Sequence, residues 1–139
     1  MNVERNRAAV LRVYEWGFNQ GRLDVVDDCI APGAGHEHAL AADEPDLATH
    51  VRNVILMLRA AMPDLYVTIE DSVAEGDRVV VRFRTTGTHS GSPLFGVRAR
   101  GKAVDAAGFH ALQFDDKGRA VRDWVMPGVD EIVRQISAA

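Results

Sequence analysis

Hydrophobic residues in the first part of the chain recur at the spacing of amphipathic helices. The pattern predicts helices over residues 3–19, 23–30 and 47–62. On the first helix Tyr14 lies on the same hydrophobic stripe as Phe18, so Tyr14 rather than Trp16 should face the interior. Asp46 or Thr49 can cap the third helix, because a side-chain oxygen there can accept an unpaired backbone N–H.

From residue 65 onward the period of the pattern changes from helical to the alternation of a strand. Strands are predicted over residues 65–73, 78–89, 103–114 and 119–127, followed by a short helix within 129–136. Helices first and meandering strands afterwards define an α+β domain, in which a curved antiparallel sheet wraps the helices on one face. Residues 31–46 read as a loop, and no linker divides the chain, so we expect one domain over residues 1–139.

The hairpin predicted over residues 109–124, FHALQFDDKGRAVRDW, carries one histidine and one aspartate among hydrophobic residues. A four-residue turn over 115–118 places His110 directly opposite Asp123 and puts Trp124 on the other face. Opposed side chains in a sheet begin about 4.5–5.5 Å apart, which is close enough for a hydrogen bond. The sequence therefore predicts a buried imidazole–carboxylate pair.

Such a pair has a chemical and a structural interpretation. A buried histidine beside a carboxylate can exchange a proton with a bound molecule near neutral pH. The same two side chains can also do no more than satisfy each other's hydrogen bonds. A slip of one residue in the register would separate His110 from Asp123 across the sheet.

Composition and charge narrow the choice of partners. The 139 residues are 47% hydrophobic and 26% charged with a net charge of −4, as expected of an ordinary globular domain. Without a basic surplus, nucleic acid is not an expected partner. The single cysteine, Cys29, allows no intrachain disulfide and no multi-cysteine zinc site. The sequence has no predicted leader and no apolar run long enough for a membrane span, so we expect a cytoplasmic protein.

Several segments of the sequence resemble the SnoaL-like polyketide cyclase family of the nuclear-transport-factor-2-like (NTF2-like) superfamily. They are MPDLYVTIEDSVAEGDRVVVRFRTTGTHSG, GVRARGKAV, FHALQFDDKGRAVRDW and the terminal DEIVRQI. The resemblance covers roughly residues 14–136, although the stretch from Ala31 to His50 matches poorly. It implies an NTF2-like α+β cone, in which the curved antiparallel sheet and the N-terminal helices enclose a hydrophobic pocket.

The resemblance also implies an activity. Cyclases of this family close the last ring of aromatic polyketides in antibiotic biosynthesis by an intramolecular aldol reaction, with no metal and no cofactor. Asp123, directly before Trp124, and His110 match the family's acid/base aspartate and its assisting histidine. Relatives have diverged into hydroxylation, epoxide opening and simple binding, so a hydroxylase, a hydrolase and a non-catalytic binding protein for a hydrophobic small molecule remain alternatives.

Further residues are predicted to line the pocket. The substrate-binding candidates are Tyr14, Phe18, His38, Leu58, Leu112 and Val121. His36 and His38 form an H-x-H pattern that could place two imidazoles on one face of a strand, but no cysteine or carboxylate at ligand spacing reinforces a metal site there. We therefore expect no metal.

The opposite face of the predicted sheet carries its own hydrophobic patch. Trp124 and Met126 would be exposed on this face in a monomer. Arg82, Arg84 and Arg122 should lie on the same outer face. Relatives commonly form oligomers through the sheet, so the expected assembly is a homodimer or a higher homo-oligomer, with no membrane partner.

Overall fold

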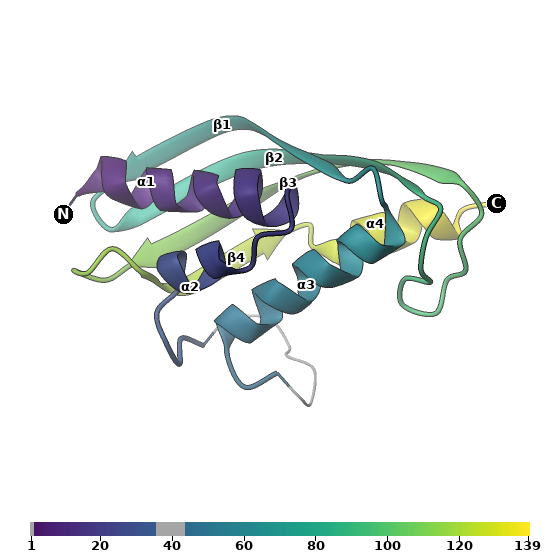
Figure 1. Ribbon diagram of the computed structural model, residues 1–139. Helices are drawn as coiled ribbons and strands as arrows, with labels where there is room; N and C mark the ends of the chain where they lie inside the picture. Colours follow the sequence, from purple (N-terminus) through teal and green to yellow (C-terminus); the bar gives the residue numbers. More distant parts are fainter. Residues whose placement is uncertain (1, 36–43) are drawn as a thin grey trace.

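The computed structural model describes residues 2–35 and 44–139 and confirms the predicted α+β fold (Figure 1). Its elements in chain order are α1 (Val3–Arg12), η1 (Val13–Phe18), α2 (Asp24–Cys29), α3 (Leu47–Ala61), β1 (Tyr66–Glu75), β2 (Arg78–His89), β3 (Lys102–Phe114), β4 (Ala120–Met126) and α4 (Val129–Ser137). Each predicted helix and strand corresponds to one of these elements, except that the first helix has two parts. No helix in the described ranges is long and apolar enough to cross a membrane.

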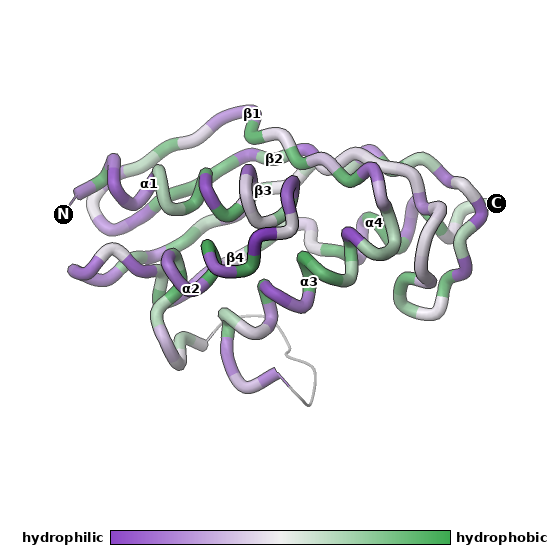
Figure 2. Tube along the Cα trace, viewed as in Figure 1, coloured by the Kyte–Doolittle hydropathy of each residue, from purple (hydrophilic) through white to green (hydrophobic). Residues whose placement is uncertain are grey.

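The four strands form one antiparallel sheet in the order β1-β2-β3-β4. Its strands curve over α1 and α3, which lie on the same side of the sheet (Figure 1). Burial alternates along β3, where the inward positions from Val104 to Phe114 are buried. Hydrophobic and hydrophilic positions likewise alternate along the elements in Figure 2. The sheet therefore has one face turned toward the helices and one turned away from them.

Hydrogen bonds between side chains and backbone fix the helices to the sheet. The Asn19 amide donates to the Val67 carbonyl at 2.9 Å, and the Val67 N–H donates back to the Asn19 side chain at 2.7 Å. Gln135 on α4 makes the same two-way contact with the backbone of Asp105 on β3, at 2.8 and 2.9 Å. Asp46 caps α3 by accepting the N–H of Thr49, which settles the choice of cap.

The first helix changes its winding where it reaches the interior. Residues Val13–Phe18 form a π-helical turn, and the Asn19 N–H donates to the carbonyl of Tyr14, five residues earlier, at 3.1 Å. A π-turn shifts the side chains that follow it relative to a regular α-helix and is frequent at functional sites. Here it lies at Tyr14, which is buried, as its hydrophobic stripe predicts.

The β3–β4 hairpin has a different register from the predicted one. Asp123 pairs with Leu112, and His110 pairs with Val125, so His110 and Asp123 are diagonal neighbours rather than opposite residues. The loop has one residue more than expected, because Phe114 pairs with Ala120. A bulge between this pair and the next adds a second residue.

The extra loop residue and the bulge residue together explain which side chains lie on the predicted face of the sheet and which do not. Asp115 builds the longer loop, because its carboxylate accepts the N–H groups of Lys117 and Arg119 at 2.9 and 3.0 Å. After the loop alone the alternation is inverted, so Ala120 is fully buried while Val121 is the unpaired bulge residue. After the bulge the original alternation returns, and Asp123 lies on the concave face as predicted.

Candidate active site

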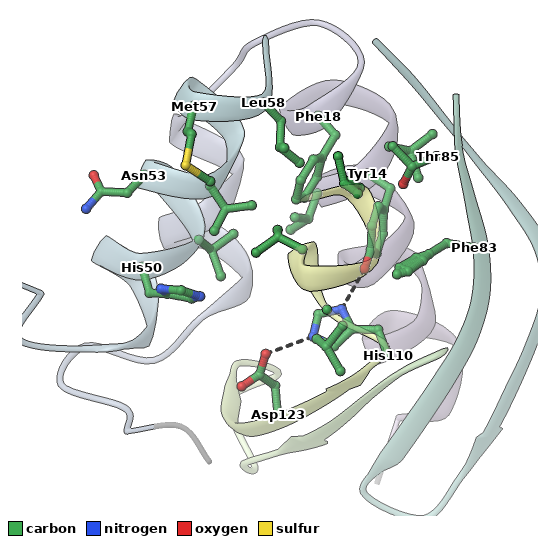
Figure 3. A pocket seen from close by; sticks show the side chains of 18 of the residues that line it. Tyr14, Phe18, His50, Asn53, Met57, Leu58, Phe83, Thr85, His110 and Asp123 are labelled. Carbon is green, nitrogen blue, oxygen red and sulfur yellow. Dashed lines mark hydrogen bonds and ion pairs between the residues drawn. The ribbon is translucent and has the colours of Figure 1, made fainter. Parts of the chain in front are cut away.

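The concave face of the sheet and the helices enclose a cavity of about 850 Å³. Hydrophobic and aromatic side chains supply most of its wall, from η1, α2, α3 and all four strands. The volume lies in the range of pockets that hold drug-sized molecules, and such pockets usually have a few polar groups in an apolar lining. His110 and Asp123 are two of these polar groups (Figure 3).

His110 and Asp123 are hydrogen-bonded in the interior. His110 Nε2 lies 2.9 Å from Asp123 Oδ2, and the two residues are 9% and 3% exposed. Their diagonal positions on β3 and β4 place both side chains on the concave face, and the longer reach of an imidazole spans the diagonal. The predicted pair therefore forms through a different register from the expected one.

Tyr14 extends the pair into a chain of three hydrogen-bonding side chains (Figure 3). Its hydroxyl lies 2.7 Å from His110 Nδ1, and its ring stacks on Phe18 with centroids 5.1 Å apart. Burial, and secondarily the charge of Asp123, raises the pKa of Tyr14 well above its usual value. The hydroxyl therefore remains protonated and can donate to His110.

These contacts assign the tautomer of the histidine. An ionised Asp123 can only accept a hydrogen bond, so Nε2 of His110 carries the proton that it donates to Oδ2. In a neutral ring Nδ1 is then the acceptor for the Tyr14 hydroxyl. Each side chain has one fixed role in the chain, so Tyr14 orients His110 and His110 orients Asp123.

The second carboxylate oxygen of Asp123 has a different environment. Oδ1 is buried and has no hydrogen-bond partner among the described residues. Buried polar atoms are normally paired, because an unpaired one costs about 1–3 kcal/mol. A buried acceptor at the wall of a large cavity is therefore suited to a hydrogen or a proton of a bound molecule.

The structure places most of the predicted site residues on the cavity wall. Tyr14, Phe18, Leu58, Leu112, His110 and Asp123 all line it. Val121 does not, because the longer loop places Ala120 inward and leaves Val121 as the unpaired residue of the bulge. His36 and His38 lie outside the described residues, as does any strand predicted near them.

Several polar residues of the cavity were not predicted from the sequence, among them Glu44, His50 and Asn53. His50 follows Leu47 by three residues on α3, so helical spacing gave a signal for it. Asn53 lies at the same interval again, on the border of the hydrophobic stripe. Glu44 precedes the helix in a loop, where no periodicity indicates the direction of a side chain.

Cys29 also lines the cavity at the end of α2. Its thiol is buried, and burial raises its pKa to about 12, so it stays a neutral thiol at physiological pH. Among residues 2–35 and 44–139 no three histidine, cysteine or acidic side chains lie together as a metal site. His89 is buried elsewhere, where its Nε2 donates to the Ser92 carbonyl at 2.9 Å.

The outer face of the sheet differs from the cavity in its chemistry. Arg78 and Arg122 lie over the ring of Trp124 at 5.4 and 5.7 Å from its centroid. Met126 is 77% exposed on the same strand. The predicted hydrophobic patch is therefore present, although cations partly cover its aromatic member.

A curved antiparallel sheet over helices, with an apolar cavity between them, is the architecture of an NTF2-like protein. The model of the SnoaL-like polyketide cyclase family matches residues 8–136. The chain belongs to this family. No curated protein matches the sequence.

Solved structures agree with this assignment. A candidate SnoaL-like polyketide cyclase from Jannaschia is 25% identical, with a TM-score of 0.78 and coverage of 100% of this chain and 96% of that one. IdmH from Streptomyces antibioticus, a candidate polyketide cyclase, is 26% identical, with a TM-score of 0.74 and coverage of 96% and 99%. TsrD from Streptomyces laurentii is 24% identical, with a TM-score of 0.79 and coverage of 96% and 98%.

Proposed function

We propose that the protein catalyses an intramolecular aldol ring closure of an aromatic polyketide-like substrate, with Asp123 as the acid/base group and His110 as its assistant. One observation carries the proposal: Asp123 lines the cavity with a carboxylate whose Oδ1 is buried without a hydrogen-bond partner among the described residues, while His110 holds its Oδ2 at 2.9 Å. Membership of the SnoaL-like family supports the same reaction class.

The reaction begins with removal of a proton. Asp123 takes a proton from a carbon that lies between two carbonyl groups, where the resulting negative charge is delocalised as an enolate. The Nε2–H of His110 keeps the carboxylate oriented, so the proton is received at Oδ1. Positioned acid–base groups of this kind contribute about 10²–10⁴-fold to a rate.

Ring closure and return of the proton complete the reaction. The enolate carbon attacks a second carbonyl of the same molecule, a carbon–carbon bond forms, and the carbonyl π-electrons move to oxygen as an alkoxide. The proton on Asp123 returns to this alkoxide, directly or by exchange with the Nε2–H of His110. No atom is gained or lost, and the apolar wall excludes water while it holds the two ends together.

Two other functions use the same cavity. A binding protein would hold the ligand unchanged, with the Tyr14–His110–Asp123 chain as an anchor. A hydroxylase would insert an oxygen atom and require molecular oxygen. The unpartnered Oδ1 of Asp123 can accept either a hydrogen bond or a proton from a bound molecule, so membership of the SnoaL-like family is what favours the cyclase over a binding protein.

The test is incubation of the protein with an anthraquinone that bears a 1,3-dicarbonyl side chain beside an acyl side chain. A cyclase gives a product of unchanged mass and altered retention, a hydroxylase a product heavier by one oxygen atom, and a binding protein the starting compound. Asp123→Asn keeps the shape and removes the base, so turnover should fall by at least about 10²-fold.

Asp116→Asn is the matched control, because Asp116 is an aspartate of the same hairpin in its exposed loop. This variant should turn over like the wild type. Near-full activity of Asp123→Asn, with the fold verified by circular dichroism, would show that the acid/base assignment is wrong.

A further inference from the structure

A second histidine–carboxylate pair borders the same cavity, on the helix side rather than the sheet side. His50 Nδ1 lies 3.0 Å from Glu44 Oε1, and Asn53 donates to Glu44 Oε2 at 2.9 Å. All three residues line the cavity. In Figure 3 the His50 ring extends from α3, on the helix side of the cavity, whereas Asp123 and His110 project from the strands.

The burial of this second pair needs a reason. The Glu44 side chain is only 7% exposed, and that of His50 is 26% exposed. Taking a carboxylate out of water is costly, so a buried carboxylate has to be held by hydrogen bonds, which His50 and Asn53 supply to the two oxygens of Glu44. A hydrophobic residue at position 50 would continue the apolar wall that Val51 and Val54 provide on the same helix.

The hydrogen bonds fix the direction of the imidazole. Glu44 is held at both oxygens, so its carboxylate cannot rotate freely, and it holds His50 through Nδ1. A side chain whose rotamer is fixed in this way loses little entropy when it binds a ligand. Its partial exposure places it at the boundary between cavity and solvent, where one end of a bound molecule would meet it.

We propose that His50, oriented by Glu44, binds an oxygen substituent at the end of the substrate remote from the reacting carbon. This inference rests on the proposed function for the position of that carbon, at Asp123. It assigns a substrate class: a flat hydrophobic body that carries a hydroxyl or carbonyl oxygen at each end. One end lies against Asp123 and the other against His50.

The inference is tested by measuring the affinities of two probes by isothermal titration calorimetry. The probes are 2-hydroxyanthraquinone and 2,6-dihydroxyanthraquinone. They share one flat tricyclic body and differ by a hydroxyl at the second end. The wild type should bind the dihydroxy probe about 3–10-fold more tightly, the worth of one hydrogen bond. In His50→Phe the ratio should fall to about 2, the statistical advantage of a symmetric ligand, while affinity for the monohydroxy probe changes little.

Two further variants separate orientation from packing. Glu44→Gln keeps the shape of the side chain but supplies only one acceptor oxygen, so the ratio should be intermediate. Arg52→Gln is the control, because Arg52 lies on the same helix and binds Asp27 outside the cavity at 2.6 Å. This variant should keep the wild-type ratio. In turnover assays His50→Phe should raise KM and leave kcat nearly unchanged.

The outcomes separate this inference from the proposed function. An unchanged probe ratio in His50→Phe overturns the inference, whatever Asp123→Asn does. A lost ratio together with an active Asp123→Asn would keep the His50 contact and reject the aldol reaction. Failure of both probes to bind the wild type would overturn the assignment of a flat aromatic substrate with two polar ends.

Discussion

The cavity contains two histidine–carboxylate pairs with similar hydrogen bonds and different surroundings. His110–Asp123 spans 2.9 Å between adjacent strands, with side chains 11% and 4% exposed. His50–Glu44 spans 3.0 Å between a helix and the loop before it, and the histidine is 26% exposed. Similar geometry therefore occurs once on a rigid sheet in the interior and once at the edge of the cavity.

The difference in surroundings separates two chemical roles. Charges and hydrogen bonds act more strongly where water is excluded, so the deeper pair is suited to proton transfer. The Tyr14 hydroxyl also holds the deeper pair through its hydrogen bond to His110 Nδ1. The imidazole is therefore fixed at both nitrogens and cannot easily reorient. The outer pair is partly exposed to solvent and is suited to binding a substrate oxygen. The free energy of one hydrogen bond is enough to select a ligand that carries this oxygen over one that lacks it.

The largest expected difference between the pairs is in stability. His110→Phe leaves the Tyr14 hydroxyl and Asp123 Oδ2 buried without their partner, so the free energy of unfolding should fall by about 3–5 kcal/mol. His50→Phe removes one hydrogen-bond partner of Glu44 and leaves the hydrogen bond from Asn53, so the loss should be smaller, about 1–2 kcal/mol. Urea unfolding of both variants measures the contrast. Equal losses would show that depth does not distinguish the pairs.

A smaller effect is expected at Tyr14. Tyr14→Phe removes one hydrogen bond and leaves His110 Nδ1 without a donor, which should cost about 1 kcal/mol of unfolding free energy at pH 7. The folded-state pKa of Tyr14 is raised above its usual value of 10.0. The stability linked to the protonated hydroxyl is therefore complete below about pH 10 and is lost as the pH rises above it.

The pH dependence offers a direct check on this tyrosine. Wild-type stability should decline more steeply than that of Tyr14→Phe above about pH 10, when unfolding is followed in urea at a series of pH values. Absorbance of the native protein near 295 nm, where phenolate absorbs, should show no contribution from Tyr14 up to about pH 11. Parallel declines in the two proteins would mean that the hydroxyl is not held protonated by the fold.

The sequence predicted the deeper pair and missed the outer one for physical reasons. Alternation along β3 and β4 puts His110 and Asp123 on one face of the sheet. This result is correct for any register that differs from the predicted one by an even number of residues. The expected loop was one residue too short and the bulge was unforeseen, but together they changed the register by two residues. The direct pairing of His110 with Asp123 was therefore wrong although their shared face was right, and Val121, which lies within the bulge, does not line the cavity as predicted.

No comparable periodicity relates Glu44 to His50. Their contact depends on how the chain before Asp46 approaches the first turns of α3, and loop geometry of this kind follows from tertiary packing. The fold itself was predictable, because long elements with strong periodicity and a family resemblance indicated the same α+β cone. The hydrophobic pattern predicts that Tyr14 is buried, but it gives no indication of the π-turn at this residue.

The smallest expected effect concerns the helix end that supports the outer pair. Asp46 accepts the N–H of Thr49 at 2.9 Å, and this backbone hydrogen bond is the main reason why its pKa lies below the usual value. Asp46→Ala should cost about 1 kcal/mol of unfolding free energy at pH 7. A lowered pKa means that this stability is present above about pH 4 and is lost as the pH falls through the folded-state pKa.

Asp46→Asn refines this measurement, because asparagine caps a helix about as well as aspartate and carries no charge. Its stability relative to Asp46→Ala should change little between pH 3 and pH 7, whereas the wild-type advantage should shrink at the acidic end. Since His50 lies one turn into α3, the uncapped variant should also lower the dihydroxy-to-monohydroxy affinity ratio, while turnover that depends on Asp123 stays near wild type. A fall in turnover as large as the fall in the ratio would mean that the two pairs are not independent, and that the helix end supports the sheet-side chemistry as well.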